Sequence, residues 1–488
     1  MPLIAALHEF ISSDPAYFRI PAHRFSNGVD PELETLLGGS VFRADLTEAE
    51  GLDDLHAPSG AIKEAEQLAA ELWGSEECHF LVNGSTCGNE AMLLTCVKPG
   101  EKILIARNVH KSVLMGLILS GAVPVWIQPE ELPGWDMDGP ILPEQIEQSL
   151  SENPECRAVL LVSPTYYGVC SPLHEIARVC HDRGIPLLVD EAHGSHLYFM
   201  EEAPMGALPA GADLVVQSVH KTGGSMTQSS LLHVQGDLID RVRLRESLAM
   251  VMSTSPSYVL MASLDGARHQ LAVSGKELLR EACHLAEKCR NDLRRIRGIE
   301  VADNKNSDPL RIVFTARKCG VSGFELQNRL YQQDRISLEL SDPLYAVAVI
   351  TWGNTDRDIH RLVDAVRKVA EDAYGTAVEK EYEYPAFSEE TLQYICPEIA
   401  CTPREAWYDE KESCDLGKAC GRIAAESVIP YPPGVPVLYP GERITQGLLQ
   451  KLCLFRDVHM PLHGPEDPSL RKIRVLKRDG ISELKQAL

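Results

Sequence analysis

The residues best suited to chemistry in this sequence are a lysine, an aspartate and a run of small polar residues, each placed just after an apolar segment. Lys221 stands in SVHKTGG, Asp190 begins DEAHG, and residues 83–89 read NGSTCGN ahead of an apolar helical pattern. A lysine can form a Schiff base, a carboxylate can pair with a pyridinium nitrogen, and a Gly-Ser-Thr loop at a helix start can bind phosphate. Together the three segments predict a pyridoxal phosphate site.

Each segment also has a simpler interpretation when it stands alone. The Gly-Ser-Thr loop could only cap the following helix, Asp190 could be a structural carboxylate at a strand end, and Lys221 could be a solvated charge. A nucleotide-binding loop would need a lysine within residues 83–89, and that segment has none. The prediction therefore depends on the combination of the three groups.

Seven apolar runs alternate with helical patterns between about residues 75 and 240, and they indicate how these groups could meet. The runs are rich in Val, Ile and Leu without polar alternation, which is typical of strands buried on both faces of a parallel sheet. Ligands bind beyond the carboxyl ends of such strands, so the reactive side chains would converge on one crevice. We therefore expect an α/β fold with a mostly parallel, seven-stranded sheet flanked by helices. The runs are residues 80–82, 103–105, 123–127, 158–162, 186–189, 214–216 and 231–234.

The chain is expected to have four parts. Residues 1–50 form an N-terminal segment that begins with an amphipathic helix, and residues 51–298 form the large cofactor-binding domain, which ends in long helices. A smaller α/β domain should follow at residues 299–377, and a C-terminal domain at 378–488. An acidic, tyrosine-containing stretch, residues 378–385, is expected to link these last two parts.

Composition argues against several classes of function. The 47 basic and 70 acidic residues give a net charge of -23, which disfavours nucleic acid as a partner. No apolar stretch is long enough to cross a bilayer, so we expect no membrane partner. Fourteen cysteines without regular spacing favour free thiols in a reducing cytoplasm. We expect no metal site, because Cys396, Cys401, Cys414 and Cys420 lack the paired spacing of zinc ligands.

Several motifs give the chain a resemblance to a known family. SVHKTGGSMTQSS (218–230), LLVDEAHGSH (187–196) and ARNVHKS (106–112) resemble segments of the ornithine, lysine and arginine decarboxylases of the aspartate-aminotransferase fold, which is pyridoxal phosphate fold type I. The chain is most similar to short bacterial members that lack an N-terminal wing domain and are typically biosynthetic arginine decarboxylases. Further matches extend the resemblance over nearly the whole chain: Pro21–Arg24, Leu52–Pro58, Ser253–Tyr258, Tyr431–Gly434 and Pro440–Glu442.

The resemblance implies roles for five residues around the cofactor ring. Lys221 would hold pyridoxal phosphate as a Schiff base, and Asp190 would keep its ring nitrogen protonated, so that the ring can accept the electrons left by departing CO2. His110 would stack on one face of the ring and Ala192 would support the other. His193 would lie close to the ring as a further catalytic group, where larger members carry tryptophan.

The remaining cofactor contacts are implied for polar side chains in three loops: Ser85, Thr86, Ser218, His220, Thr254 and Ser255. Ser85 and Thr86 would offer hydroxyl donors to the phosphate at a helix start. Thr254 and Ser255 match residues that reach the phosphate of the neighbouring subunit, which implies a homodimer or a dimer-based oligomer. An ordinary cap before Pro256 is the alternative role for these two residues.

The resemblance also implies a basic amino acid as the substrate. A cationic side chain needs a carboxylate, and a guanidinium favours a fork-shaped pairing with one. The candidates by family match are Glu339, Asp342 and Glu426, each of which could instead be structural. Arginine, converted to agmatine and CO2 in polyamine biosynthesis, is our first choice because of the short architecture. Lysine and ornithine, which give cadaverine and putrescine, remain open.

Two other classes of protein stay possible. An aminotransferase would use the same lysine and aspartate but would accumulate a keto acid in place of amine and CO2. An inactive regulatory homologue would have little need for an intact set of Lys221, Asp190 and His110, and it would lack the visible absorbance of a bound cofactor.

Overall fold

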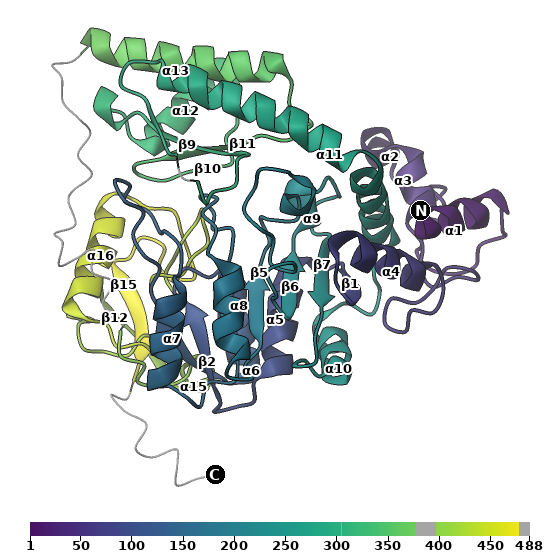
Figure 1. Ribbon diagram of the computed structural model, residues 1–488, viewed down its shortest axis with the longest axis horizontal. Helices are drawn as coiled ribbons and strands as arrows, with labels where there is room; N and C mark the ends of the chain where they lie inside the picture. Colours follow the sequence, from purple (N-terminus) through teal and green to yellow (C-terminus); the bar gives the residue numbers. More distant parts are fainter. Residues whose placement is uncertain (304, 377–396, 478–488) are drawn as a thin grey trace. The chain divides into compact units, whose positions relative to one another are not determined.

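The computed structural model describes residues 1–303, 305–376 and 397–477 (Figure 1). The expected linker at 378–385 and Cys396 lie outside the described residues. The chain divides into two compact units. Unit 1 contains residues 1–96, 158–163 and 173–277, and unit 2 contains residues 97–157, 164–172 and the part from 278 onward. The expected boundaries of the four parts stay predictions.

A seven-stranded sheet contains all seven of the apolar runs, in the order β1-β7-β6-β5-β4-β2-β3. Strands β4, β5 and β6 pair in parallel, as do β2 and β3, whereas β7 is antiparallel to both β1 and β6. The expectation of an α/β fold with a mostly parallel, seven-stranded sheet is confirmed. The strands are β1 (Glu77–Leu81), β2 (Lys102–Ala106), β3 (Val123–Ile127), β4 (Val159–Val162), β5 (Leu187–Asp190), β6 (Leu214–Gln217) and β7 (Ser230–Val234).

Helix α5 packs against four strands of unit 1, β1, β5, β6 and β7. The helix approaches the sheet closely at Gly88, where an added Cβ would lie 2.5 Å from a methyl carbon of Val216 and 2.9 Å from one of Leu81. Glycine at this position therefore lets the helix lie directly on the sheet. The helices of unit 1 are α1 (Pro2–Ser12), α2 (Pro31–Leu37), α3 (Gly39–Ala44), α4 (Ala61–Trp73), α5 (Gly84–Cys96), α8 (Leu173–His181), the 3-10 turn η1 (Leu197–Phe199), α9 (Val219–Thr222) and α10 (Arg241–Val251).

The helices expected at the N-terminus and after the large sheet are present. Helix α1 is amphipathic and buries Leu3 and Leu7. The long helical region after the sheet forms two helices, α10 and the 37-residue α11 (Tyr258–Arg294). They are separated near Pro256, because proline cannot donate a hydrogen bond within a helix.

Unit 2 contains a smaller, antiparallel sheet with the order β10-β11-β9-β8. Helix α12 packs against β10 and β11, and α13 packs against α12 (Figure 1). The strands are β8 (Glu300–Val301), β9 (Arg311–Thr315), β10 (Leu340–Ser341) and β11 (Ala346–Val349), and the neighbouring helices are η2 (Arg317–Cys319), α12 (Gly323–Asp334) and α13 (Asp356–Thr376).

The C-terminal part of unit 2 has its own apolar core, which includes Val428, Leu438, Leu452 and Val475. Two short antiparallel pairs, β12 with β15 and β13 with β14, frame this core. The elements are α15 (Pro403–Tyr408), β12 (Lys411–Asp415), η3 (Leu416–Lys418), β13 (Ile429–Pro430), α16 (Gln446–Asp457), β14 (Leu462–His463) and β15 (Lys472–Leu476). Earlier in the chain, unit 2 also holds α6 (Lys111–Ser120) and α7 (Pro143–Glu152).

Every cysteine in the described part of the chain is free. Across residues 1–303, 305–376 and 397–477, no helix combines the length and the apolar character needed to cross a bilayer.

Glu66 is a buried carboxyl group on α4, with 2% of its surface exposed. Its Oε1 accepts a hydrogen bond from Phe80 N at 3.0 Å. Burial disfavours the charged form and raises the pKa of Glu66 from 4.5 to about 8. The folded protein thus holds this proton more tightly than the unfolded chain. The stability that Glu66 contributes is therefore fully present below pH 4.5 and is lost as the pH rises through about 8.

We predict that Glu66→Gln, which is neutral at every pH, flattens the pH dependence of the free energy of unfolding between about pH 5 and pH 8.5. Across this window the wild type should lose on the order of 4 kcal/mol more than the variant, as measured by urea denaturation. Glu64→Gln, at an exposed position of the same helix, should keep the wild-type slope. Parallel slopes for the wild type and Glu66→Gln would contradict the assignment.

Candidate functional site

Asp190 and Lys221 follow neighbouring strands of unit 1. Asp190 is the last residue of β5 and lies opposite Val216 of β6 in the parallel register. Strand β6 ends at Gln217, and the short helix α9 that follows carries Lys221. The carboxylate and the amine thus both lie at the carboxyl end of the parallel strands, as the sequence predicted.

The Asp190 carboxylate is buried, with 2% of the residue exposed, and both of its oxygens accept hydrogen bonds. Asn89 Nδ2 donates to Oδ2 at 2.8 Å, and Ala192 N donates to Oδ1 at 3.1 Å. A buried carboxylate is costly unless such donors replace water, so the two bonds also fix its orientation.

Sequence reasoning did not assign a role to Asn89. The signal that could have found it is its spacing from Ser85, because residues four apart share one face of a helix. Both residues stand on α5, and both are buried. The face of α5 that begins with the predicted phosphate-binding hydroxyl therefore also supplies the donor to Asp190.

Three buried serine hydroxyls meet where α5 begins, β6 ends and β7 begins. Ser85 Oγ lies 2.7 Å from Ser218 Oγ and donates to Ser230 Oγ at 3.2 Å. Thr86 is half-buried next to them on the first turn of α5. Hydroxyl donors at the N-terminus of a helix suit a phosphate group, so this serine cluster is the part of unit 1 that best fits one.

His193 lies next to the amine of the candidate lysine. Its Nε2 is 3.0 Å from Lys221 Nζ, and the residue is buried. A contact of this length allows a proton to pass between the two groups. The His220 ring contacts the backbone instead, since its Nδ1 lies 2.9 Å from Ser229 O. Burial lowers the pKa of His220, which favours the neutral ring.

Glu191 is a second buried residue of the site region that the sequence did not single out. Its carboxylate accepts hydrogen bonds from Tyr198 Oη (2.6 Å), Gln217 Nε2 (2.7 Å) and Ala207 N (2.7 Å). Burial raises the pKa of Glu191 to about 7. These bonds tie the segment after β5 to β6, and so they hold the segment that carries His193 in place.

Thr254 and Ser255 lie on an exposed loop between α10 and α11. The loop is attached to the start of α5, because Ser253 N donates to Asn83 Oδ1 at 3.2 Å. Their expected contact with a neighbouring subunit stays a prediction.

His110 belongs to unit 2, where it caps the N-terminus of α6. Its Nδ1 accepts a hydrogen bond from Ser112 N at 3.3 Å and lies 2.9 Å from Ser112 Oγ. The imidazole is thus oriented by the helix that it caps.

Two of the three candidate substrate carboxylates accept hydrogen bonds from neighbouring residues of unit 2. Asp342 accepts hydrogen bonds from the Tyr167 hydroxyl and from backbone N–H groups of residues 344 and 345. Glu426 accepts from Glu466 N at 2.8 Å and Arg474 N at 2.9 Å. Glu339 differs, since its exposed carboxylate makes no hydrogen bond or ion pair with the residues that the structure describes.

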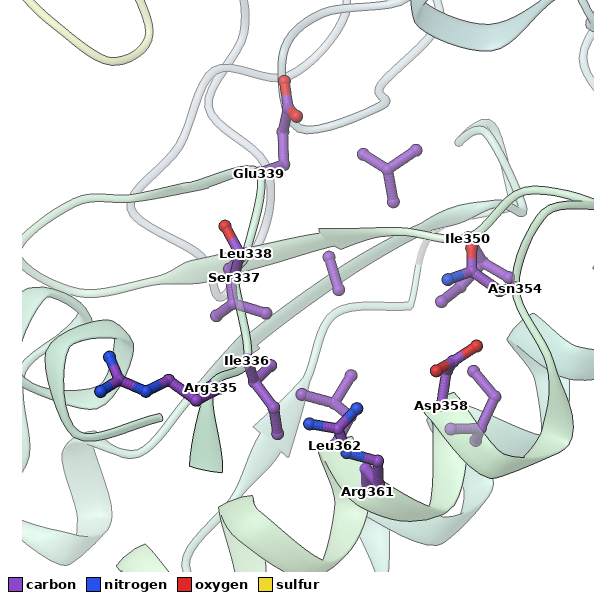
Figure 2. A pocket seen from close by; sticks show the side chains of 13 residues that line it. Arg335, Ile336, Ser337, Leu338, Glu339, Ile350, Asn354, Asp358, Arg361 and Leu362 are labelled. Carbon is purple, nitrogen blue, oxygen red and sulfur yellow. The ribbon is translucent and has the colours of Figure 1, made fainter. Parts of the chain in front are cut away.

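Glu339 lies at one end of a pocket of about 390 Å³ between α13 and the segment that leads into β10. In Figure 2 its carboxylate points away from Arg361 and Asp358 at the other end. Apolar side chains such as Leu338 and Leu362 form the wall between them.

The charged groups at the helical end of this pocket have structural roles. Arg361 donates to Asp334 O at 3.0 Å, and Asp358 accepts from Thr355 N at 2.9 Å at the start of α13. The Arg335 guanidinium lies 5.5 Å from the centroid of the Tyr331 ring. The charged groups at this end of the pocket therefore do not point to a separate ligand-binding site.

The described residues contain no group of three or more His, Cys, Asp and Glu side chains that could hold a metal ion.

Family models match most of the chain. The model described as Orn/Lys/Arg decarboxylase, major domain, matches residues 1–314, and the model described as Orn/Lys/Arg decarboxylase, C-terminal domain, matches residues 385–462.

Similar curated proteins include two arginine decarboxylases. The chain is 38% identical to that of Bacillus subtilis (strain 168) over 484 residues, which cover 98% of both proteins. It is 36% identical to that of Halalkalibacterium halodurans over 486 residues, which cover 98% of this chain and 97% of the relative. The lysine decarboxylase of Pseudomonas aeruginosa is 24% identical over 560 residues, which cover 91% of this chain and 74% of the relative.

Solved structures of two lysine decarboxylases have the same fold. That of Francisella novicida matches with a TM-score of 0.84 at 21% identity, covering 98% of this chain and 81% of the other. The constitutive lysine decarboxylase of Escherichia coli matches with a TM-score of 0.81 at 20% identity, covering 98% and 82%. The expected fold class is confirmed by this likeness.

We predict that Asn89→Ala lowers the free energy of unfolding by about 1–3 kcal/mol, because the Asp190 carboxylate stays buried and loses a donor. The loss should be smaller when Asp190→Asn removes the charge, so a double-mutant cycle by urea denaturation measures the coupling. Asn291→Ala, at an exposed site on α11, controls for the change in helix propensity. Equal losses in the two backgrounds would show that Asn89 does not act on Asp190.

Proposed function

Because the chain belongs to the Orn/Lys/Arg decarboxylase family, we propose that it is a pyridoxal phosphate-dependent arginine decarboxylase that forms agmatine and CO2 in polyamine biosynthesis. The family match confirms the expectation of a decarboxylase. Arginine is supported as the substrate by four arginine decarboxylases that are 36–38% identical to the chain. The lysine decarboxylases among the curated relatives are 22–24% identical.

The observation that carries the proposal is that Lys221 and Asp190 lie at the ends of neighbouring strands, in the same unit as the serine cluster. These groups fit pyridoxal phosphate: hydroxyls at a helix start suit its phosphate, an amine suits its aldehyde, and a buried carboxylate suits its ring nitrogen. When bound, the cofactor supplies an electron sink for the carbanion that CO2 leaves behind.

The residues of unit 1 would divide the work around that cofactor. Asp190, held by Asn89 and Ala192 N, would keep a proton on the ring nitrogen. His193 would take a proton from the Lys221 amine or return one, since the two nitrogens lie 3.0 Å apart. Stacking of His110 and Ala192 on the two ring faces is part of the proposal and is supported by the resemblance to the family.

Glu339 is the carboxylate that we propose to read the substrate side chain. Asp342 and Glu426 already accept hydrogen bonds from their own surroundings. Glu339 is exposed, and a guanidinium can pair with its carboxylate through two parallel hydrogen bonds.

We also propose a homodimer or a dimer-based oligomer in the cytoplasm. The exposed Thr254 and Ser255 support the assembly, because residues that serve a neighbouring subunit must be accessible in a single chain. The free cysteines of the described residues support a reducing compartment.

The proposed function is tested with purified protein supplied with pyridoxal phosphate and, in turn, arginine, lysine and ornithine. We expect agmatine and CO2 from arginine, at a kcat/KM higher than those for the other two. Lys221→Ala should lose roughly 10³-fold or more in turnover and should not be labelled when borohydride reduces the cofactor onto the protein. Lys98→Ala, which removes an exposed lysine, should behave as the wild type.

Three outcomes would overturn parts of the proposal. Predominant cadaverine or putrescine would replace arginine with lysine or ornithine. A keto acid in place of CO2 would indicate an aminotransferase. The absence of both product and visible cofactor absorbance would indicate a regulatory homologue.

We predict that Glu339→Gln raises the KM for arginine by about 10–100-fold, which corresponds to the loss of a hydrogen bond between charged groups. Because Glu339 would contact the side chain and not the reacting carbon, kcat should change less than KM. Glu325→Gln, which removes an exposed carboxylate on α12, serves as the control. An unchanged KM for Glu339→Gln would remove Glu339 from the substrate site.

A further inference from the structure

The C-terminal part of unit 2 contacts the edge of the His110 ring. Lys111 N donates to Gly434 O at 3.0 Å, which places the backbone of residue 434 beside the start of α6. A Cβ added to Gly434 would lie 3.2 Å from His110 Cδ2 and 3.3 Å from His110 Nε2. Those distances are shorter than ordinary van der Waals contacts, so a side chain at residue 434 would require the His110 ring to shift by a few tenths of an ångström.

The turn that presents Gly434 is held in place on both sides. Within it, Gly434 N donates to Pro430 O at 2.9 Å. The Tyr431 ring stacks on His463, with ring centroids 4.2 Å apart and an angle of 14° between the planes. Lys111 Nζ lies 5.1 Å from the centroid of the Tyr431 ring. Prolines at 432 and 433 restrict the backbone further, so Gly434 is part of a stiff surface.

The loop that ends in His110 is anchored at its other end by a buried ion pair. Arg107 donates from both Nη atoms to the carboxylate of Glu442, at 2.6 and 2.9 Å. Its guanidinium carbon lies 4.8 Å from the centroid of the Trp126 ring and 4.3 Å from that of Tyr439. A bidentate ion pair of this kind restricts the orientation of the Arg107 side chain. The C-terminal part therefore fixes the position of the loop.

The His110 ring is thus confined on two sides. Ser112 N and Oγ hold its Nδ1, and Gly434 occupies the space beside the opposite Cδ2–Nε2 edge. The plane of the imidazole is therefore set by two segments more than 300 residues apart in the sequence.

We propose that Gly434 is a positioning residue, which sets the plane of the His110 ring by lacking a side chain where the ring must lie. The proposal depends on the proposed function in one respect, namely that His110 stacks on the cofactor ring. Side chains in a reacting site must keep their geometry within about 0.5 Å and 10–20°. Gly434 would thereby affect catalysis through the His110 ring, without contacting the substrate itself.

The test compares two glycines of the same C-terminal part. Gly434 has a φ of +91° and Gly421 a φ of +82°, so alanine is strained to a similar extent at either position. An added Cβ at Gly421, however, meets nothing within 4 Å. Gly421→Ala therefore reports the cost of backbone strain alone, and Gly434→Ala reports strain plus the contact with His110.

The first readout needs no cofactor. In urea denaturation of the apoprotein, Gly434→Ala should lower the midpoint more than Gly421→Ala does, and the excess should shrink when His110→Ala is also present. No coupling between positions 434 and 110 would overturn the proposal, whatever the activity of the protein. Should Gly434→Ala not fold, Gly434→Asn and Gly421→Asn provide the same comparison, since asparagine tolerates positive φ better.

The second readout uses the protein loaded with pyridoxal phosphate. Gly434→Ala should change the visible circular dichroism of the bound cofactor and lower kcat by about 10–100-fold, with a change in KM of less than about threefold. Gly421→Ala should match the wild type, and Gly434→Ala should cause no further loss once His110 is alanine. Equal spectra and rates for the two glycine variants would overturn the proposal. If positions 434 and 110 are coupled in the apoprotein but no basic amino acid is turned over, the proposed function is contradicted. The contact between Gly434 and the His110 ring would still be supported.

Discussion

A buried carboxylate at the end of β5 is the constraint on which the rest of unit 1 depends. The Asp190 carboxylate can remain in the interior only with hydrogen-bond donors to both oxygens. One donor is the nearby Ala192 N, and the other is Asn89 on α5, which is distant in the sequence. That donor is within reach because α5 lies directly on the sheet, where Gly88 leaves room for Val216. The absence of a side chain at residue 88 and the charge at residue 190 are thus parts of one arrangement.

The same close packing also assembles the polar groups around that carboxylate. With α5 against the sheet, its first turn meets the end of β6 and the start of β7, and the hydroxyls of Ser85, Ser218 and Ser230 come together. The parallel register of β5 and β6 brings the segments of Asp190 and Lys221 to one edge. The groups that a pyridoxal phosphate enzyme needs are therefore a consequence of strand direction and helix packing.

In unit 2, contacts with the C-terminal part hold the loop that carries His110. The segment from Arg107 to His110 follows β2, and its two ends are fixed by the C-terminal part through the Glu442 ion pair and the turn at Gly434. Burying an ion pair is costly, but the two-fold contact and the flanking aromatic rings offset that cost. The C-terminal part thus fixes the loop from Arg107 to His110 at both of its ends.

The sequence by itself determined the strands, the reactive segments and the family resemblance. Buried parallel strands have a local signature, so all seven apolar runs became strands, and Lys221 and Asp190 were found from their positions after two of them. The tertiary structure alone decided which residues pair. Asn89 bonds to a carboxylate 101 residues away and Arg107 to one 335 residues away, and the antiparallel direction of β7 likewise depends on its neighbours. Such contacts arise when distant segments pack together. A local pattern, such as the four-residue spacing of Ser85 and Asn89, indicates a shared helix face but not the partner across the fold.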